Sequence, residues 1–199
     1  MIWTAKGVIS SAATKPRVSS VSEPYEICPP NRDDLPVVRN LARFYVYDMS
    51  EHAGFDFADD GLFAAGASLD NYWGIKPEAP QDQWPAHWRG FAHLIRVNGH
   101  PAGFALVRQI ADGLYDMGEF FIARKYRRKG AGKDIATTMF RLYPGRWEVR
   151  EMPTNVGAQA FWRRIIGDFT GGAYEESRER FPAYRNAEFI VQRFDSRGR

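Results

Sequence analysis

Cysteine, histidine and long apolar runs are scarce in this sequence, and each scarcity excludes a class of protein. Cys28 is the only cysteine among the 199 residues, so the chain cannot form an intramolecular disulfide or a cluster of thiolate ligands. The four histidines include no i, i+4 pair that could hold a metal on a helix, and we expect no metal. No run of about 18 apolar residues occurs, so we expect no membrane span and a cytoplasmic protein.

The composition that remains is that of a globular protein. With 44% hydrophobic and 15% aromatic residues, the chain has enough apolar surface to build one domain with a substantial core. Residues 1–22 differ, because they are rich in Ser, Thr and Ala, contain no acid and show no sustained period. We interpret them as a mobile tail, with an organelle-targeting segment as the alternative, and expect a single domain over residues 23–199.

The first half of the chain predicts a strand, a helix and a three-stranded meander. A short strand at YEIC, from Tyr25, precedes an amphipathic helix whose apolar residues recur at spacings of 3 and 4. These residues are Leu35, Val38, Leu41, Ala42 and Tyr45. Residues 51–90 predict loops and short helices. The Asn98-Gly99 pair between two β-rich runs is typical of a hairpin, and a second turn at residues 111–113 gives three antiparallel strands before residue 124.

The second half predicts two more helices, a strand and a closing hairpin. One helix follows the glycines near residue 130, carries an apolar stripe and stops at Pro144-Gly145. The stripe consists of Ala131, Ile135, Met139 and Leu142. RWEVRE alternates as a strand, and Thr154 or Asn155 then caps a helix. Its predicted buried face is Ala158, Phe161, Trp162, Ile165 and Ile166. AYEESRERF and AEFIVQRF complete an α+β fold with one sheet covered by helices.

The densest positive charge lies at one strand-to-helix junction, in FFIARKYRRKGAGKDIATTMF. Its basic residues are Arg124, Lys125, Arg127, Arg128, Lys129 and Lys133, and no acid interrupts them. The amides at a helix start favour an anion, and Gly130 and Gly132 let a phosphate approach the backbone. The spacing does not match a nucleoside triphosphatase loop. A nucleic-acid patch is the alternative, but a charged surface alone would not require two glycines at such a junction.

Two motifs in this context resemble the GNAT superfamily of N-acetyltransferases. They are Arg-x-x-Gly-x-Gly from Arg127 to Gly132, between a strand and an amphipathic helix, and Asn-x-x-Ala-x-x-Phe-Trp from Asn155 to Trp162. The resemblance covers roughly residues 24–194 and is strongest to a bacterial subgroup with WEV before the Asn. It implies a mixed, mostly antiparallel sheet flanked by helices, two splayed strands at a cofactor cleft, and acetyl-coenzyme A (acetyl-CoA) as cosubstrate.

The resemblance also implies which residues contact the cofactor. The loop of residues 127–133 would cradle the pyrophosphate, and residues 122–124 would pair with the pantetheine arm. The full set is Ile122, Ala123, Arg124, Arg127, Arg128, Lys129, Gly130, Ala131, Gly132, Lys133, Asn155 and Trp162. Asn155 has a second interpretation as a helix cap. Trp162 stands where the family often has a Tyr that protonates the departing thiolate, so it is a core residue or a wall for the pantetheine instead.

Acetyl transfer to an amine requires a base, because an alkylamine with a pKa of about 10.4 is almost wholly charged at neutral pH. The resemblance places Glu119 and Glu148 near the splayed strands, and Asp116 is a third candidate. Strand alternation puts Glu119 and Asp116 on opposite faces unless a bulge intervenes. We favour Glu148 over Glu119; ordinary solvated or paired carboxylates are the alternative.

The acceptor is expected to meet an acidic and aromatic group in the first half of the chain. Its members are Tyr45, Tyr47, Asp48, Glu51, Asp59, Asp60, Tyr72 and Trp73. If they converge, a cationic amine is the natural acceptor; otherwise they are surface acids and core aromatics. The sequence thus predicts an N-acetyltransferase acting on a small-molecule or peptide amine, as a monomer or homodimer, without nucleic acid. The alternative is a module that binds acyl-coenzyme A without turnover.

Overall fold

A computed structural model describes residues 24–63, 67–74, 88–184 and 186–199. The expected mobile tail at residues 1–22 lies outside the described residues, as does part of the predicted loop region between residues 51 and 90. Within the described ranges, no helix combines the length and apolarity that a membrane crossing requires.

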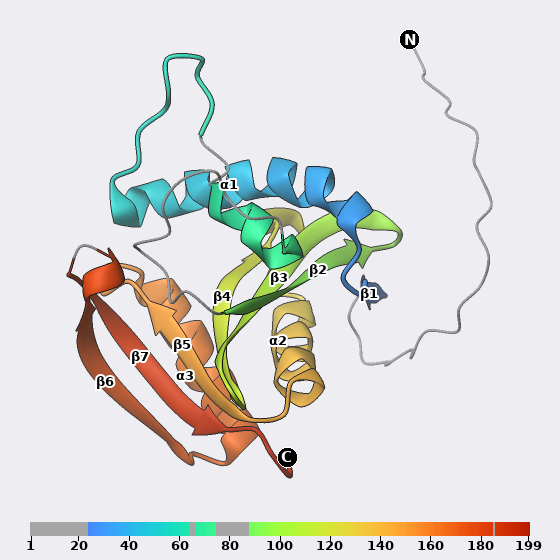
Figure 1. Cartoon of the computed structure of the whole chain (residues 1–199). Coiled ribbons are helices and arrows are strands. Elements are labelled where there is room, and N and C mark those ends of the chain that lie inside the picture. Colours follow the sequence, from blue (N-terminus) through green and yellow to red (C-terminus); the bar gives the residue numbers. More distant parts are fainter. Residues whose placement is uncertain (1–23, 64–66, 75–87, 185) are drawn as a thin grey trace.

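The centre of the fold is one seven-stranded sheet, in the order β1-β2-β3-β4-β5-β7-β6 (Figure 1). Its strands are β1 Tyr25–Ile27, β2 Arg89–Val97, β3 His100–Ala111, β4 Leu114–Ile122, β5 Arg146–Glu151, β6 Tyr174–Phe181 and β7 Ala187–Asp195. Neighbouring strands are antiparallel except β4 and β5, which run parallel. The predicted first strand, the meander, the RWEVRE strand and the closing hairpin are all confirmed.

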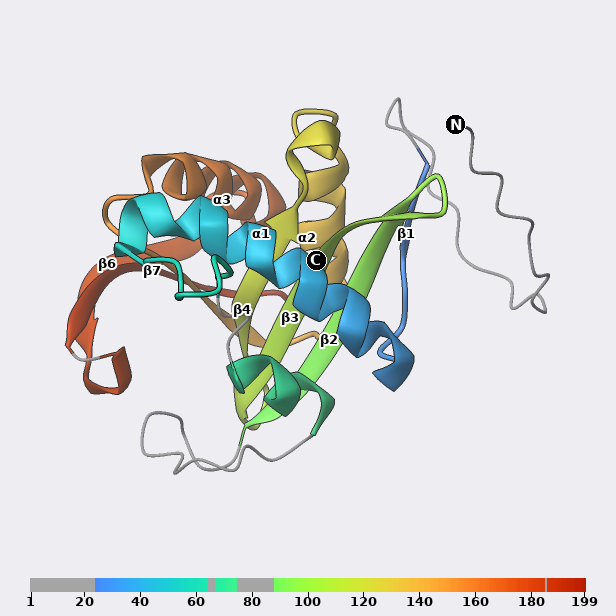
Figure 2. The ribbon, with the colours of Figure 1, turned by 90° about the horizontal axis from the view of Figure 1, so that it is seen from above.

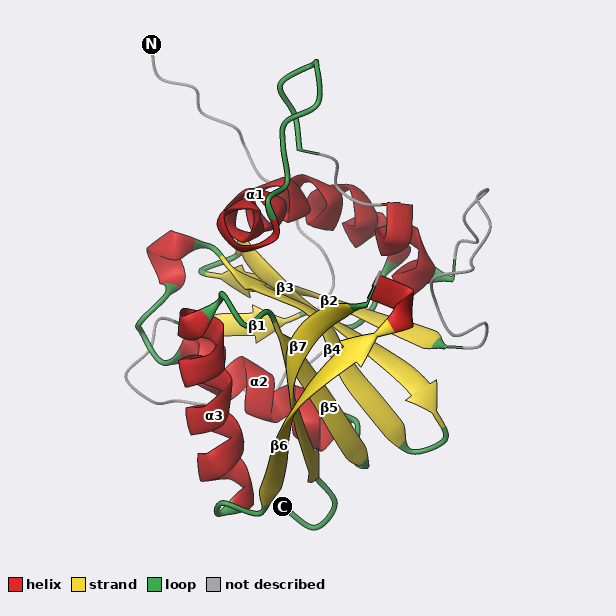
Figure 3. Cartoon of the chain, turned by 90° about the vertical axis from the view of Figure 1, so that its left-hand side faces the viewer, coloured by secondary structure: helices red, strands yellow, loops and turns green. Residues whose placement is uncertain are grey.

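Three helices cover the two faces of the sheet (Figure 3). α1 (Leu35–Ala53) lies on one face, and α2 (Ala131–Leu142) and α3 (Val156–Thr170) lie on the other. The described ranges also contain four short 3-10 helices: η1 Arg32–Asp34, η2 Ala67–Trp73, η3 Arg124–Tyr126 and η4 Pro182–Tyr184. The predicted α+β fold, with one mostly antiparallel sheet flanked by helices, is confirmed.

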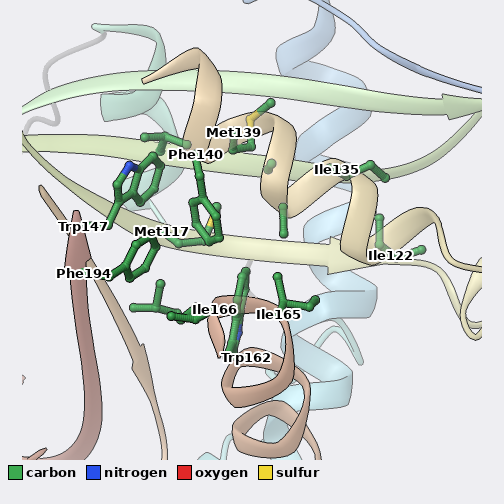
Figure 4. Packing of buried hydrophobic residues seen from close by; sticks show 14 of the residues in the cluster. Met117, Ile122, Ile135, Met139, Phe140, Trp147, Trp162, Ile165, Ile166 and Phe194 are labelled. Carbon is green, nitrogen blue, oxygen red and sulfur yellow. The ribbon is translucent and has the colours of Figure 1, made fainter. Parts of the chain in front are cut away.

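Two apolar cores hold these layers together. The larger core packs α2 and α3 against the sheet through aromatic and branched side chains, and Trp147, Phe140 and Trp162 meet in it (Figure 4). The smaller core packs α1 against the opposite face through residues such as Val38 and Phe104. The two cores pack against opposite faces of the sheet and so hold the strands around the point where β4 and β5 meet.

Local signals explain where the elements turn and end. Asn98 and Gly99 both have positive φ, 52° and 78°, as the tight hairpin predicted between β2 and β3 requires. Asn155 caps α3, because its side-chain oxygen accepts the Ala158 amide at 3.0 Å. The stripe predicted for α2 is buried as far as Met139, but Leu142 is 52% exposed, because the helix ends there and the next residue is its C-cap.

Candidate active site

The parallel strands β4 and β5 separate soon after they pair. Residues 114–116 of β4 pair with residues 146–148 of β5, and no further pairing joins the two strands. A cavity of about 610 Å³ lies beside the point of divergence, with walls from β4, β5, α1, α3 and the region around η4. The splay expected of these strands is confirmed, and it opens the sheet where a substrate could enter between its two faces.

Two acidic residues of β4 reach this cavity because the strand carries a β-bulge. Met117 and Glu119 pair with consecutive residues of β3, so Gly118 has no partner of its own in the ladder. The extra residue cancels the alternation of the strand, and Asp116 and Glu119 both line the cavity. We expected these carboxylates on opposite faces unless a bulge intervened, and the bulge is present.

The bulge position can hold only a glycine without rearrangement. A Cβ atom at Gly118 would lie 2.0 Å from the hydroxyl of Tyr72 and 2.9 Å from Nε of Arg108. Tyr72 is 4% exposed and is packed in the smaller core, so it cannot move away cheaply. The close approach of these side chains therefore depends on a residue with no side chain.

Glu119 has the environment of a proton acceptor. The hydroxyl of Tyr45, which α1 places over the cavity, lies beside its carboxylate. Burial raises the pKa of Glu119 above its usual value, while the Tyr45 hydroxyl and the Arg108 guanidinium oppose that rise. Burial and the nearby Glu119 also raise the pKa of Tyr45. A carboxylate with a raised pKa and a hydrogen-bond donor beside it can accept a proton in a closed site.

Asp116 sits between two guanidinium groups. Arg108 and Arg150 both donate to its Oδ2 atom, and the Arg150 contact measures 2.6 Å. The side chains of Asp116 and Arg108 are 1% and 5% exposed, so this is a buried ion cluster. Arg108 also donates to the hydroxyl of Tyr184 at 3.3 Å. Asp116 therefore serves to hold two arginines at the cavity wall.

The structure does not bring Glu148 and Glu119 together. Glu148 lines a second hollow, between β5, β7 and the segment after α3, and is absent from the walls of the cavity. Its Oε1 atom accepts Nε of Arg193 at 3.0 Å. This geometry makes it one member of a cross-strand ion pair, which was the alternative that the sequence left open.

The junction between β4 and α2 has the predicted strand-to-helix order. After β4 and η3, α2 begins at Ala131 with Gly130 as its N-cap. Gly130 has φ +87°, and a Cβ atom there would meet nothing within 4 Å. Ala131 and Gly132 continue the first turn, with Ala131 buried and Gly132 facing Phe161. The helix therefore starts at an open surface, where its first amides favour an anion.

Acidic residues of other elements pair with Arg124, Arg127 and Lys133 at the junction. Asp48 of α1 pairs with both Arg124, at 2.7 Å, and Arg127. Lys133 pairs with Asp168 of α3 at 2.6 Å. Arg128 and Lys129 are exposed. Carboxylates from other elements thus reduce the positive field expected from the sequence. They are distant in the sequence, so counting the charges of residues 124–133 could not reveal them.

The remaining residues of the predicted cofactor set surround the splay. Ile122 is buried, its carbonyl accepts Nε of Arg127 at 2.6 Å, and the Ala123 amide donates to Ala102 of β3 at 2.8 Å. Asn155 and Trp162 line the cavity from α3. Trp162 is only 6% exposed and packs edge-on against Phe120, so it belongs to the core and to the cavity wall at once.

The predicted acidic and aromatic group does not converge. Of its eight members only Tyr45 lines the cavity. Asp48 is engaged at the junction, Tyr72 and Trp73 belong to the smaller core, and the others lie at the surface or away from the cavity. Within the described ranges, no three His, Cys, Asp or Glu side chains are grouped as a metal site requires. The acidic acceptor site expected from the sequence is therefore not formed.

Sequence reasoning missed Arg108 and Arg150, although a signal for each existed. Arg108 interrupts the apolar run GFALVRQI, and counting back from the turn at residues 111–113 sets it opposite Asp116. Arg150 alternates with the apolar residues of RWEVRE, so it had to face away from Trp147 and Val149. What the sequence could not supply was the bulge that brings Glu119 to the same cavity.

Comparison with known proteins points to one family. The sequence model of the acetyltransferase (GNAT) family matches residues 51–167, which is more than half of the chain. That segment contains β2 to β5, α2 and most of α3, and so includes the splay and the junction. No curated protein matches the chain.

Solved structures of similar fold agree with that match. An acetyltransferase from Thermus thermophilus has a TM-score of 0.57 and 11% identity, over 86% of this chain and 96% of its own. A GNAT-family acetyltransferase from Staphylococcus aureus has a TM-score of 0.52 and 12% identity, over 85% and 98%. A Bacillus subtilis acetyltransferase in complex with CoA has a TM-score of 0.50 and 9% identity, over 86% and 97%.

Proposed function

This chain belongs to the acetyltransferase (GNAT) family, for which acetyl-CoA is the cosubstrate, and we propose that it acetylates a primary amine of a small molecule or peptide. The observation that carries this proposal is the Glu119–Tyr45 pair in the cavity where β4 and β5 separate. A site for amine acetylation needs a proton acceptor next to an opening wide enough for a thioester. Glu119, with Tyr45 beside it, is a proton acceptor and lines such an opening.

We assign the base to Glu119 rather than to Glu148. Glu119 takes one proton from the ammonium group, directly or through water, so that the neutral amine can attack the thioester carbonyl. A C–N bond forms, the C–S bond breaks, and the second proton of the nitrogen passes to the departing thiolate or to solvent. The Tyr45 hydroxyl lies beside the carboxylate and opposes the rise of its pKa. Glu148 is paired with Arg193 outside the cavity and has no path to that proton. The coenzyme thiol, with a pKa of about 8.5, can leave as a thiolate without a tyrosine at position 162.

We assign cofactor binding to the junction and the adjoining strand edge. The open surface at Gly130 fits a pyrophosphate over the first amides of α2, with the basic residues up to Lys133 around it. The backbone of residues 122–124 is suited to the pantetheine arm, since that edge of β4 leaves β5. Asn155 and Trp162 line the cavity from the α3 side and would flank the thioester.

A matched pair of variants tests the assignment of the base. Glu119→Gln should lower the rate of amine acetylation about 10²- to 10⁴-fold while acetyl-CoA still raises the melting temperature. Glu148→Gln is the control, since it is isosteric in the same way and should leave the rate within a few-fold of wild type. A large loss of rate in Glu148→Gln and a small one in Glu119→Gln would instead identify Glu148 as the base.

A second candidate function rests on Trp162, because an indole cannot protonate the departing thiolate. In that case the domain would bind an acyl-coenzyme A without turning it over. A wild-type protein that binds acetyl-CoA but releases no coenzyme A with any amine of a broad panel would favour this binding module. Amine-dependent release of the thiol would eliminate it.

A further inference from the structure

Arg150 is held at the cavity wall with most of its hydrogen-bonding capacity unused. Its side chain is 13% exposed and lines the cavity. Its guanidinium lies 5.0 Å from the ring centre of Phe181 and 5.6 Å from that of Tyr184. Among the described residues it makes one hydrogen bond, from Nη2 to Asp116. A guanidinium has five N–H donors, so the rest of the fork is left for a ligand.

Arg150 shares its one hydrogen-bonding acid with a second arginine. Arg108 and Arg150 share the single carboxylate of Asp116 through the same oxygen. Glu119 and Glu179 also interact with Arg150 through their charges, but neither is hydrogen-bonded to it in the described part of the chain. Asp56, which also lines the cavity, is exposed to solvent. The unused donors of Arg150 at the cavity wall therefore favour a ligand with hydrogen-bond acceptors, and a carboxylate matches a guanidinium best.

We propose that the amine acceptor carries a carboxylate, as an amino acid does, and that Arg150 binds it. This inference rests on the proposed acetylation of an amine and names the class of that amine. A guanidinium fork matches a carboxylate with two parallel hydrogen bonds, and the rings of Phe181 and Tyr184, at right angles to each other, pack against the guanidinium and limit its movement. Phe55, Phe63 and Phe189 line other parts of the cavity and would receive an apolar side chain.

The positions of the charged groups fit the two ends of such an acceptor. Glu119 and Asp116 project from the same strand on either side of the bulge, and Asp116 holds Arg150. A carboxylate at Arg150 would therefore lie near an amine that gives its proton to Glu119. An acceptor without a carboxylate would leave the remaining donors of Arg150 without a partner on the ligand.

Calorimetric binding in the presence of saturating coenzyme A tests this inference without requiring turnover. The probes are a carboxylate series from acetate to 3-phenylpropionate, the amino acid phenylalanine, and 2-phenylethylamine, which lacks the carboxylate. We expect carboxylates of suitable size to bind. Arg150→Gln should lower their binding affinity about 10- to 100-fold. Arg150→Lys keeps the charge but loses the two-pronged guanidinium, so its affinity for carboxylates should lie between those of wild type and Arg150→Gln. The affinity for 2-phenylethylamine should be the same in all three proteins.

The control is Arg146→Gln, which removes an arginine from the same strand outside the cavity. Asp116 keeps Arg108 in the Arg150 variants, so no buried carboxylate is orphaned, and an unchanged melting temperature confirms the fold. The inference is overturned if no carboxylate binds or if Arg150→Gln binds them as wild type does. Carboxylate binding at Arg150 with no acetylation of any amine would instead refute the proposed acetyl transfer.

Discussion

Glu151 should make the protein less stable as the pH rises from acid to neutral. It ends β5, is 4% exposed, and neither of its carboxyl oxygens has a hydrogen-bond partner within the described part of the chain. Burial, with a smaller contribution from Glu176, raises its pKa from 4.5 to about 8. The native protein at pH 7 therefore holds an uncharged carboxylic acid that becomes a carboxylate when the chain unfolds.

The sign of the effect follows from the protons bound in each state. Between pH 4.5 and about 8 the native state keeps a proton that the unfolded state releases, so the free energy of unfolding falls as pH rises. The fall is at most about 1.4 kcal/mol per pH unit, with no contribution below the unfolded pKa and a plateau above the native one. Glu151→Gln keeps the shape without titrating, so at pH 8 it should be more stable than wild type by roughly 1–4 kcal/mol.

Urea unfolding of wild type and Glu151→Gln between pH 4.5 and 9 measures this difference. Groups that titrate in both proteins cancel, including His93, whose pKa is lowered by burial, and Glu179, whose pKa the Arg193 guanidinium lowers to about 2. The control is Glu175→Gln, on the exposed face of β6. Its free energy of unfolding should change with pH as that of wild type does. A stability difference that stays constant with pH would show that Glu151 is ionised in the native protein and refute the reasoning.

Two further variants probe the bulge and the junction. Gly118→Ala sets a methyl 2.0 Å from the Tyr72 hydroxyl, so it should cost about 1–3 kcal/mol in urea unfolding and disturb the adjacent carboxylates; wild-type stability would mean that the bulge is absent. Asp48→Asn frees Arg124 and Arg127, so calorimetry should find acetyl-CoA bound roughly fivefold more tightly at low salt; weaker binding would mean that Asp48 holds the site in shape.

Periodicity and turn chemistry were enough to predict the framework. The Asn98-Gly99 hairpin, the helix cap at Asn155 and the strand RWEVRE are short-range features, and each depends on residues a few positions apart. The motif at Gly130, through its resemblance to the family, predicted a cofactor-binding junction at the start of a helix. The structure has a helix that starts there. Such features survive tertiary packing because local geometry and the global fold agree.

The chemistry inside the cavity depends on contacts that no short-range pattern encodes. Glu119 reaches the cavity because one bulge shifts the phase of β4, and a bulge is not visible in a pattern of alternating residues. Glu148 was favoured as the base, but its partner Arg193 comes from β7, 45 positions away. Asp48 reaches the junction from α1, as Figure 2 illustrates by the course of that helix over the sheet. Long-range pairing decided all three positions.

The placement of acetyl-CoA at the β4–α2 junction is tested most directly by melting temperatures with and without the ligand. Ligand at about 100 times its dissociation constant should stabilise wild type by about 2.7 kcal/mol, a shift of roughly 5 to 10 °C. Gly130→Glu should lose that shift, because its carboxylate occupies the anion site. Gly113→Glu, also at a positive-φ glycine with open space, is the control and should keep it. A shift that persists in Gly130→Glu would place the cofactor elsewhere and contradict the assigned site.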